Sequence, residues 1–505
     1  MINSKSEWFN QTNVVFQQVF EQLARNLNEI HSVHYSTRFW NIFAGAWLQQ
    51  FVDMVIVRLH DEESLNQVSV ARSETHPATS LREFNQWSKT SIFVESLNAD
   101  VITQSQALQK SGIVSISTNE NRVSQGRKEK LGRTFASATY LPRYAEVLLQ
   151  LRFGRLPRGL SHSKISISAT NQQNRTLLCK TSRPLSINAE TVLALLPKYM
   201  PSVYVEGFKP LFETPKPWKS KRPPRSIFTA NRHLYDDVFN FWTALAVESG
   251  SRLVLAQHGG NYGISEFPSF SERHENLVAD RYITWGWKTD GPSYRGFALP
   301  LIRRTLHSSR PKGPLLVITE QLWKYPRSIF SDMPESSTYL GHLSSTVDGL
   351  EPEIRHNALL RIHHAHQDAA SSQIDWWKMH APDIKQDLGY IDFETRLNES
   401  RLVLIAHNGT SIPEAIALSA PTIITWSDSY MKVRENAEAV FDALEAVGIF
   451  HRTPESAASF INSVWNDVDG WWNSHATIDA RKQFTDQYAR TVPNPVRFLA
   501  QALQF

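Results

Sequence analysis

One stretch of the sequence constrains the fold more than any other: an apolar run that ends in a glycine-rich turn. Residues 253–256 are short and apolar, which is typical of a buried strand, and residues 257–263 follow with three glycines. Glycine lets a ligand approach the backbone closely. Open α/β sheets bind ligands at the carboxyl ends of their parallel strands. The stretch therefore predicts a buried strand whose following loop forms one wall of a site.

A second stretch later in the chain repeats this pattern. The apolar run Leu402–Ile405 ends in a small polar turn, and a helix is predicted directly after it. Strands alternate with helices around both stretches, which favours parallel sheets. We therefore predict an α/β fold with two Rossmann-like domains that face a central cleft. The expected divisions are residues 1–305 with a helical start, residues 313–490, and a terminal helix in residues 491–505 that crosses back to the first domain.

Apolar spacing predicts the remaining elements. Residues 8–32 and 36–60 carry apolar side chains at helical intervals, so the chain is expected to begin with helices. Residues 144–149 and 176–179 are short apolar runs, and we interpret both as extended segments.

Composition excludes several classes of protein. The 505 residues carry a net charge of +4, too little for a dedicated nucleic-acid binder, although it suits anionic substrates or peripheral contact with an anionic membrane surface. Cys179 is the single cysteine, so no intramolecular disulfide forms, as in a cytoplasmic protein. The polar N-terminus lacks the apolar core of a signal peptide.

The first loop carries the predicted catalytic groups. His258 can act as acid, base or oxyanion donor, and a structural histidine is the alternative interpretation. Among the carboxylates that follow, Glu266 is closest to the loop and is the predicted base or nucleophile. A solvated loop carboxylate is the other interpretation of Glu266. Glu272, Glu275 and Asp280 remain alternatives for the catalytic role. The neighbouring residues predicted to bind substrate are Gln257, Gly259, Gly260, Asn261 and Tyr262.

The second loop is the predicted binding site for a donor. Backbone N–H groups at a helix start bind phosphate, so Thr410 and Ser411 are candidate ligand contacts or, equally, plain helix caps. Glu414 can accept hydrogen bonds from a ribose diol, or simply complement the helix dipole. Arg361 and His363 end another strand, and we expect them to contact substrate rather than a metal. We expect no metal or other cofactor.

Several segments resemble a family of transferases for surface-carbohydrate (lipopolysaccharide and O-antigen) biosynthesis. The likeness rests on residues 257–263, 279–282, 284–287 and 406–411, with Glu414-Ala415 and Gly448–His451. Further matches are Trp471-Trp472, residues 480–484, residues 325–327, and the N-terminal pairs Phe39-Trp40 and Trp47-Leu48. The resemblance spans most of the chain.

The second loop is similar to the donor half of GT-B glycosyltransferases and to bacterial transferases that use CMP-linked 3-deoxy-ulosonic acids. This resemblance implies metal-independent transfer of a sugar from a nucleotide donor to a surface glycan or lipid-linked acceptor. A nucleotide-sugar epimerase or hydrolase, and a non-catalytic glycan-binding scaffold, remain alternatives. On the donor side the resemblance places Arg361, His363, His407, Asn408, Gly409, Thr410, Ser411 and Glu414, with His407-Asn408 where the family usually has Asp or Ser.

Overall fold

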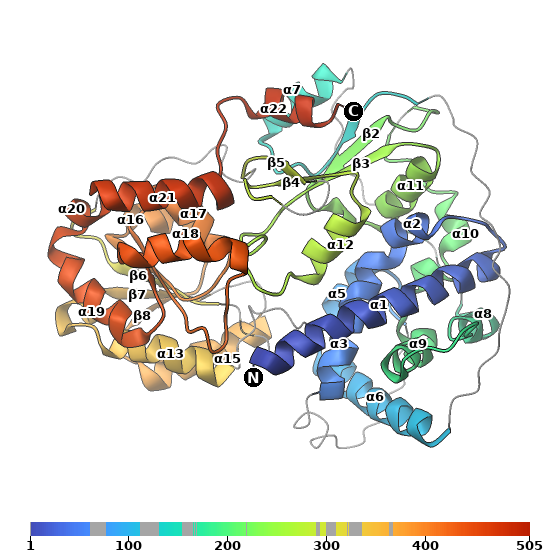
Figure 1. Ribbon diagram of the computed structural model, residues 1–505, viewed down its shortest axis with the longest axis horizontal. Helices are drawn as coiled ribbons and strands as arrows, with labels where there is room; N and C mark the ends of the chain where they lie inside the picture. The colour runs from blue at the N-terminus through green and yellow to red at the C-terminus, as the bar shows by residue number, and fades with distance from the viewer. Residues whose placement is uncertain are drawn as a thin grey trace.

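Figure 1 shows the computed structural model of the chain, with two bodies of helices and strands side by side. The structure describes residues 2–60, 77–111, 131–153, 165, 167, 169–218, 220–288, 293–298, 310–320, 322, 336–362 and 367–504.

The chain begins with a helical layer, as the apolar spacing predicts. Its helices are α1 (Ile2–His31), α2 (Thr37–Trp40), the π-helix η1 (Asn41–Gly45), α3 (Ala46–His60), α5 (Leu81–Trp87), α6 (Ser91–Ser111), α8 (Gln172–Leu177), α9 (Ile187–Tyr199), η2 (Ser202–Tyr204) and α10 (Phe208–Leu211). Trp40, Trp47 and Phe51 are fully buried at their centre. Among the described residues, one helical segment, Thr37–His60, is long and apolar enough to cross a membrane by length and composition, and 94% of its most apolar window is buried inside the protein.

The first sheet follows the helical layer. Within the described residues its parallel strands run in the order β1 (Phe135–Ala136), β2 (Ser226–Thr229), β3 (Arg252–Ala256), β4 (Arg281–Thr284) and β5 (Ser293–Arg295). Alternate residues of β3 enter different cores, since Leu253 and Leu255 pack with helix α11 (Asp237–Glu248) whereas Val254 packs on the opposite face. That opposite face is covered by α7 (Arg143–Arg152) and α22 (Pro495–Ala502), which lie above the sheet in Figure 1.

The two extended segments predicted ahead of this sheet are wrong. Residues 144–149 lie inside helix α7, and residues 176–179 cover the end of α8 and the turn after it. In α7 the buried residues are Ala145, Leu149 and Gln150, and the spacing of four between Ala145 and Leu149 puts one helical face on the sheet. Leu148 and Leu151 are exposed, and these extra apolar residues hide the helical period in the sequence.

The second sheet has the order β11 (Phe450–His451), β10 (Thr422–Thr425), β9 (Leu402–Ile405), β6 (Leu315–Ile318), β7 (Ala358–Arg361) and β8 (Lys385–Asp387), and the paired strands described are parallel. Helices cover both faces: α13 (Ser336–Asp348), α14 (Pro352–His356), α15 (Gln367–His380), α16 (Phe393–Glu399), α17 (Ser411–Ala417), α18 (Glu435–Ala446), α19 (Pro454–Val464), η5 (Trp465–Asp467), α20 (Val468–Trp472) and α21 (His475–Tyr488). The predicted α/β fold with two Rossmann-like sheets and a helical elaboration at its N-terminus is confirmed.

Candidate active site

The loop after β3 is held in one conformation by the side chain of Gln257. Its Nε2 donates to Gly259 O at 2.7 Å, while its Oε1 accepts from Trp285 N at 2.9 Å and from Trp287 Nε1 at 2.7 Å. Gly263 has a φ of +77°, and a Cβ there would come within 2.4 Å of the Trp287 ring. Glycine is therefore required at the turn. Gln257, predicted to bind substrate, is fully buried and joins the loops after β3 and β4.

The next helix, α12 (Phe270–Val278), carries the central charge of the site. Ser269 caps the helix by accepting a hydrogen bond from Glu272 N at 3.2 Å. Glu275 lies one turn later, and its side chain is completely buried at 0% exposure. A carboxylate at such a position is stable only if it is paired with charges or hydrogen-bond donors.

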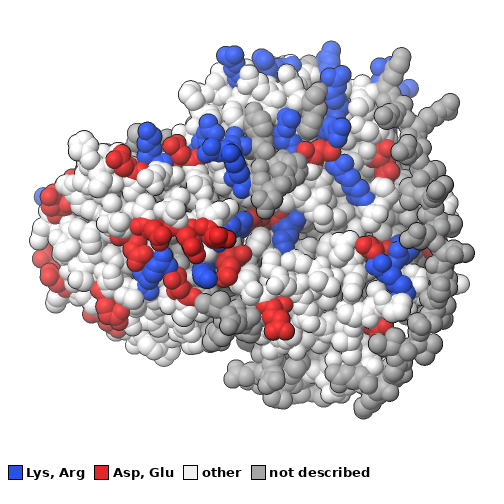
Figure 2. All heavy atoms as spheres, viewed as in Figure 1, with Lys and Arg blue, Asp and Glu red and all other residues white. Residues whose placement is uncertain are grey.

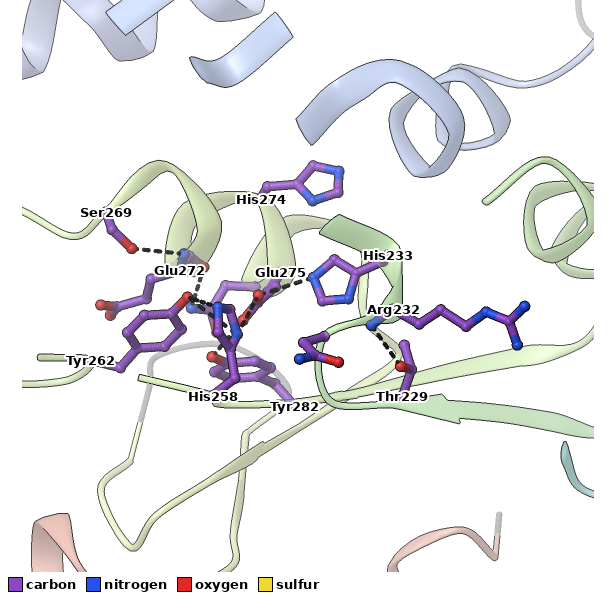
Figure 3. Close-up of polar contacts among 12 residues, drawn as sticks. Thr229, Arg232, His233, His258, Tyr262, Ser269, Glu272, His274, Glu275 and Tyr282 are labelled. Atoms are coloured by element: carbon purple, nitrogen blue, oxygen red, sulfur yellow. Dashed lines mark hydrogen bonds and ion pairs between the residues drawn. The ribbon is translucent and has the colours of Figure 1, made fainter. Parts of the chain in front are cut away.

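Side chains in β4 and in the turns after β2 and β3 supply those partners (Figure 3). His233, in the turn η3 (Arg232–Leu234) after β2, places Nε2 2.9 Å from Glu275 Oε1. His258, after β3, places Nδ1 3.2 Å from the same oxygen. Tyr282 in β4 donates its hydroxyl to Glu275 Oε2 at 2.8 Å. Burial opposes ionisation of Glu275, but His258 and His233 outweigh it and lower its pKa to about 2.

His258 is the member of this cluster that solvent can reach. Its side chain is 19% exposed, compared with 6% for His233 and 0% for Glu275. Tyr262 Oη lies 3.2 Å from His258 Nε2. Burial and the nearby Glu275 charge raise the pKa of Tyr262 well above its usual range, so the phenol stays protonated and can donate a hydrogen bond. An imidazole whose Nδ1 meets a buried carboxylate is the arrangement of a general base, with Nε2 as the working atom.

The two predicted loops touch each other. Gly260 N donates to Thr410 Oγ1 at 3.1 Å, and Asn408 Nδ2 donates to Ser265 Oγ at 2.9 Å. A Cβ on Gly260 would lie 2.6 Å from Gly409 O, so only glycine permits this approach. Arg434, ahead of α18, adds an ion pair of 3.0 Å with the buried Glu272. Loops from the two sheets thus form one junction beside His258.

The other residues predicted on the first loop have structural contacts. Asn261 O accepts backbone hydrogen bonds from Ile264 N and Ser265 N, both at 3.1 Å. Glu266 N donates to Lys432 O at 2.9 Å, and burial raises the pKa of its half-buried carboxyl group. Glu275, nine residues later and on α12, occupies the position beside His258 for which the sequence favoured Glu266.

The predicted donor residues divide into two groups. His407 Nε2 lies 2.9 Å from Ser411 Oγ, and the Thr410 hydroxyl contacts Gly260 instead of capping α17. Glu414 is buried in the first turn of α17. Arg361 is separate from them, since its guanidinium pairs with Asp387 at 2.7 Å and donates to Ile391 O at 2.8 Å. His363 lies outside the described residues.

Sequence reasoning missed His233, Tyr282 and Arg434. The signal for His233 was present: it follows the strand residues 226–229, just as His258 follows β3, and parallel neighbours end at the same edge of a sheet. Nothing local marks Arg434, because its partner Glu272 is distant in sequence. In the part of the chain that the structure describes, no group of three or more His, Cys, Asp or Glu side chains is arranged to hold a metal ion.

Comparisons with known proteins give a family. No curated protein matches the chain. Among solved structures, the chain is similar to the one described as the crystal structure of WaaG, a glycosyltransferase involved in lipopolysaccharide biosynthesis, with 11% identity over 73% of this chain and 99% of that chain. The TM-score of 0.33 is too low for that likeness to carry an inference. The model of the LIC12162 family transferases matches residues 3–503, so the chain belongs to this family of transferases.

Proposed function

We propose that the protein is a glycosyltransferase of the GT-B type, which moves a sugar from a nucleotide donor to a surface glycan or lipid-linked acceptor. One observation carries the proposal: a solvent-accessible imidazole, His258, whose Nδ1 meets the buried anionic Glu275 at the junction of two parallel sheets. Sugar transfer to a hydroxyl requires a group that takes the hydroxyl proton, and this pair is suited to that role. Membership of a transferase family supports a group-transfer reaction.

On the acceptor side, His258 is the proposed base and Glu275 its positioning residue. The acceptor oxygen bonds to the anomeric carbon, its proton passes to His258 Nε2, and the sugar–phosphate bond breaks. The nucleotide phosphate leaves with the bonding electron pair. Glu275, ionised at neutral pH, stabilises the imidazolium that forms. The acceptor hydroxyl would compete with Tyr262, whose 3.2 Å contact with Nε2 is long enough to be displaced.

On the donor side, we propose that the nucleotide lies along the loop after β9. His407, Ser411 and Glu414 are polar and lie in the loop after β9 and at the start of α17, and this loop contacts the His258 loop through Gly260. Ligands of open α/β sheets bind at such strand ends. Arg361 is instead proposed to order the β7–β8 edge, since Asp387 and Ile391 hold its guanidinium. The donor class that the family resemblance implies includes CMP-linked 3-deoxy-ulosonic acids.

The first experiment is a thermal-shift screen of the full chain with CMP, UDP, GDP and dTDP. A ligand that binds only the folded state stabilises it by about 2.7 kcal/mol at a hundred times its Kd. We expect one nucleotide to raise the melting temperature, and the corresponding nucleotide sugar to be turned over only with an acceptor. If all four nucleotides fail at millimolar concentration, the donor site is wrong.

The second experiment separates binding from chemistry. His258→Ala should keep the nucleotide-induced thermal shift and lose about a hundredfold to ten-thousandfold in turnover, the contribution of a general base. His380→Ala is the matched control, since His380 is exposed on α15 and stacks on Trp376. Turnover of a nucleotide sugar without acceptor would indicate a hydrolase or epimerase. Glycan binding that survives His258→Ala, with no nucleotide affinity, would indicate a scaffold.

A further inference from the structure

Helix α7 carries an exposed apolar stripe on its outer face. Tyr144 is 57% exposed, Leu148 52% and Leu151 50%. Their spacing of four and three residues puts them on one face of the helix. The opposite face is occupied, because Ala145 and Leu149 are buried in the core shared with α22 and the first sheet. The stripe is therefore an outward apolar face on a helix whose inner face is already packed.

Positive charge surrounds the stripe. Arg143 and Arg152 are exposed at the two ends of α7, and Arg497 is exposed on the adjoining α22. Glu146 is the one acidic residue in the sequences of these two helices, and it is half-buried, accepting a hydrogen bond from Thr139. Figure 2 shows Lys and Arg along the upper edge of the molecule, where Figure 1 places α7 and α22, with little negative charge among them.

The start of α7 belongs to the rim of the candidate active site. Tyr140, in the link between β1 and α7, accepts a hydrogen bond from Asn231 Nδ2 at 2.7 Å. Asn231 follows β2, at the same edge of the sheet as His258. Burial raises the pKa of Tyr140, and the charge of Glu275 adds to the effect. The stripe thus begins next to the proposed acceptor side and runs away from it.

We propose that α7 docks the protein on a bilayer that contains anionic phospholipids. Tyr144, Leu148 and Leu151 would enter the headgroup region, while Arg143, Arg152 and Arg497 contact lipid phosphates. An amphipathic helix with basic residues beside its apolar face binds such surfaces through apolar burial and electrostatic attraction together. A lipid-linked acceptor in that bilayer would meet the site at the end of the helix where Tyr140 lies.

Charge distinguishes α7 from another exposed apolar surface, on the second sheet. Met379 is 73% exposed and Tyr390 is 79% exposed near the β8 edge of the second sheet. The carboxylates nearby in sequence are also exposed, with Asp375 at 71% and Asp383 at 46%. Lys378, 65% exposed, pairs with Asp375 there, so that surface carries mixed charge and lacks the basic surroundings that would attract α7 to an anionic bilayer.

The test is vesicle flotation with the full chain, which needs no catalysis. We expect the protein to float with phosphatidylcholine vesicles that contain phosphatidylglycerol, and much less with pure phosphatidylcholine. The double variant Leu148→Glu/Leu151→Glu should bind the anionic vesicles at least tenfold more weakly. Met379→Glu is the matched control, because it adds the same charge at an exposed apolar position outside the stripe, and it should bind as the wild type does.

Two further measurements separate lipid binding from misfolding and from self-association. Arg143→Glu/Arg152→Glu should abolish the preference for anionic vesicles, and thermal melts should show all variants folded. The proposal is overturned if the wild type does not float above background, if the double variant floats like the wild type, or if sedimentation shows that the double variant converts a dimer into a monomer. Because binding is measured without turnover, failure here leaves the proposed transfer reaction untouched.

Discussion

The pairing of Glu275 with His258 makes the sharpest prediction. Glu275→Gln keeps the shape of the side chain and removes its charge, so His258 loses the anion that stabilises its protonated form. The two groups are 3.2 Å apart. At an effective dielectric constant of about 20, Coulomb's law gives about 5 kcal/mol for a charge pair at this distance.

That energy sets the size of the expected effect. Each 1.36 kcal/mol of barrier is roughly tenfold in rate, so about 5 kcal/mol corresponds to a loss of between a thousandfold and ten-thousandfold in kcat. His258 is 19% exposed, and water screens part of the interaction. We therefore expect kcat to fall at least about a hundredfold, while KM for the nucleotide sugar changes little because Glu275 does not touch the donor loop.

The assay is nucleotide release from the sugar donor identified by thermal shift, with acceptor present. Tyr282→Phe is the matched control, since it removes a 2.8 Å hydrogen bond to the same carboxylate and leaves the His258 contact in place. We expect a smaller loss of kcat from that variant than from Glu275→Gln, because the carboxylate keeps its charge and its contact with His258. The reasoning is refuted if Glu275→Gln remains folded and loses no more activity than Tyr282→Phe.

Two other predictions concern stability. Gly260→Ala would place a Cβ 2.6 Å from both Gly409 O and Thr410 Cα, so we expect the free energy of unfolding in denaturant to fall by about 1–3 kcal/mol and turnover to be reduced. Gly341→Ala is the control and should cost nothing, because the space at its Cβ is open. Equal effects of the two variants would contradict the close approach at Gly260. Burial raises the pKa of Asp237 from 3.8 to about 7, so the contribution of this group to the free energy of unfolding should fall by about 4 kcal/mol as pH rises between those values, because the unfolded carboxyl releases its proton first. Asp237→Asn should remove this dependence, and a stability difference between variant and wild type that stays constant from pH 4 to pH 8 would be inconsistent with the raised pKa.

The parts of the fold that were predictable are those encoded locally. Continuous apolar runs such as Leu402–Ile405 identify buried parallel strands, and glycines after them identify loops that approach something closely. Open α/β sheets bind ligands at the carboxyl ends of their strands, so the turns near His258 and Gly409 were expected to line one cleft between two domains. In the structure Gly260 N and Thr410 Oγ1 lie 3.1 Å apart.

The rest depends on orientation, which a single sequence does not encode. Glu266, Glu272 and Glu275 are close together in the sequence, and the packing of the loop that holds Glu266 and of α12 after it decides which carboxylate meets His258. Helix α7 was missed for a related reason. Its Leu148 and Leu151 are apolar but lie on the exposed face of the helix, so they obscured the helical spacing of the buried positions. The donor role of His363 stays a prediction.

Helix α22 is made last but completes the core of the first sheet, so folding of that sheet depends on the order of synthesis. Leu499 and Leu503 fill the core above β2 and β3, yet everything from β6 to α21 must leave the ribosome before they do. A nascent first domain can form its strand ladder early, but one side of that ladder remains open until the second domain has been made. A chain that stalls after the first domain and before α22 would expose the hydrophobic face of this sheet, and such surfaces bind chaperones or aggregate. The two halves of the enzyme therefore mature together, although each has its own sheet.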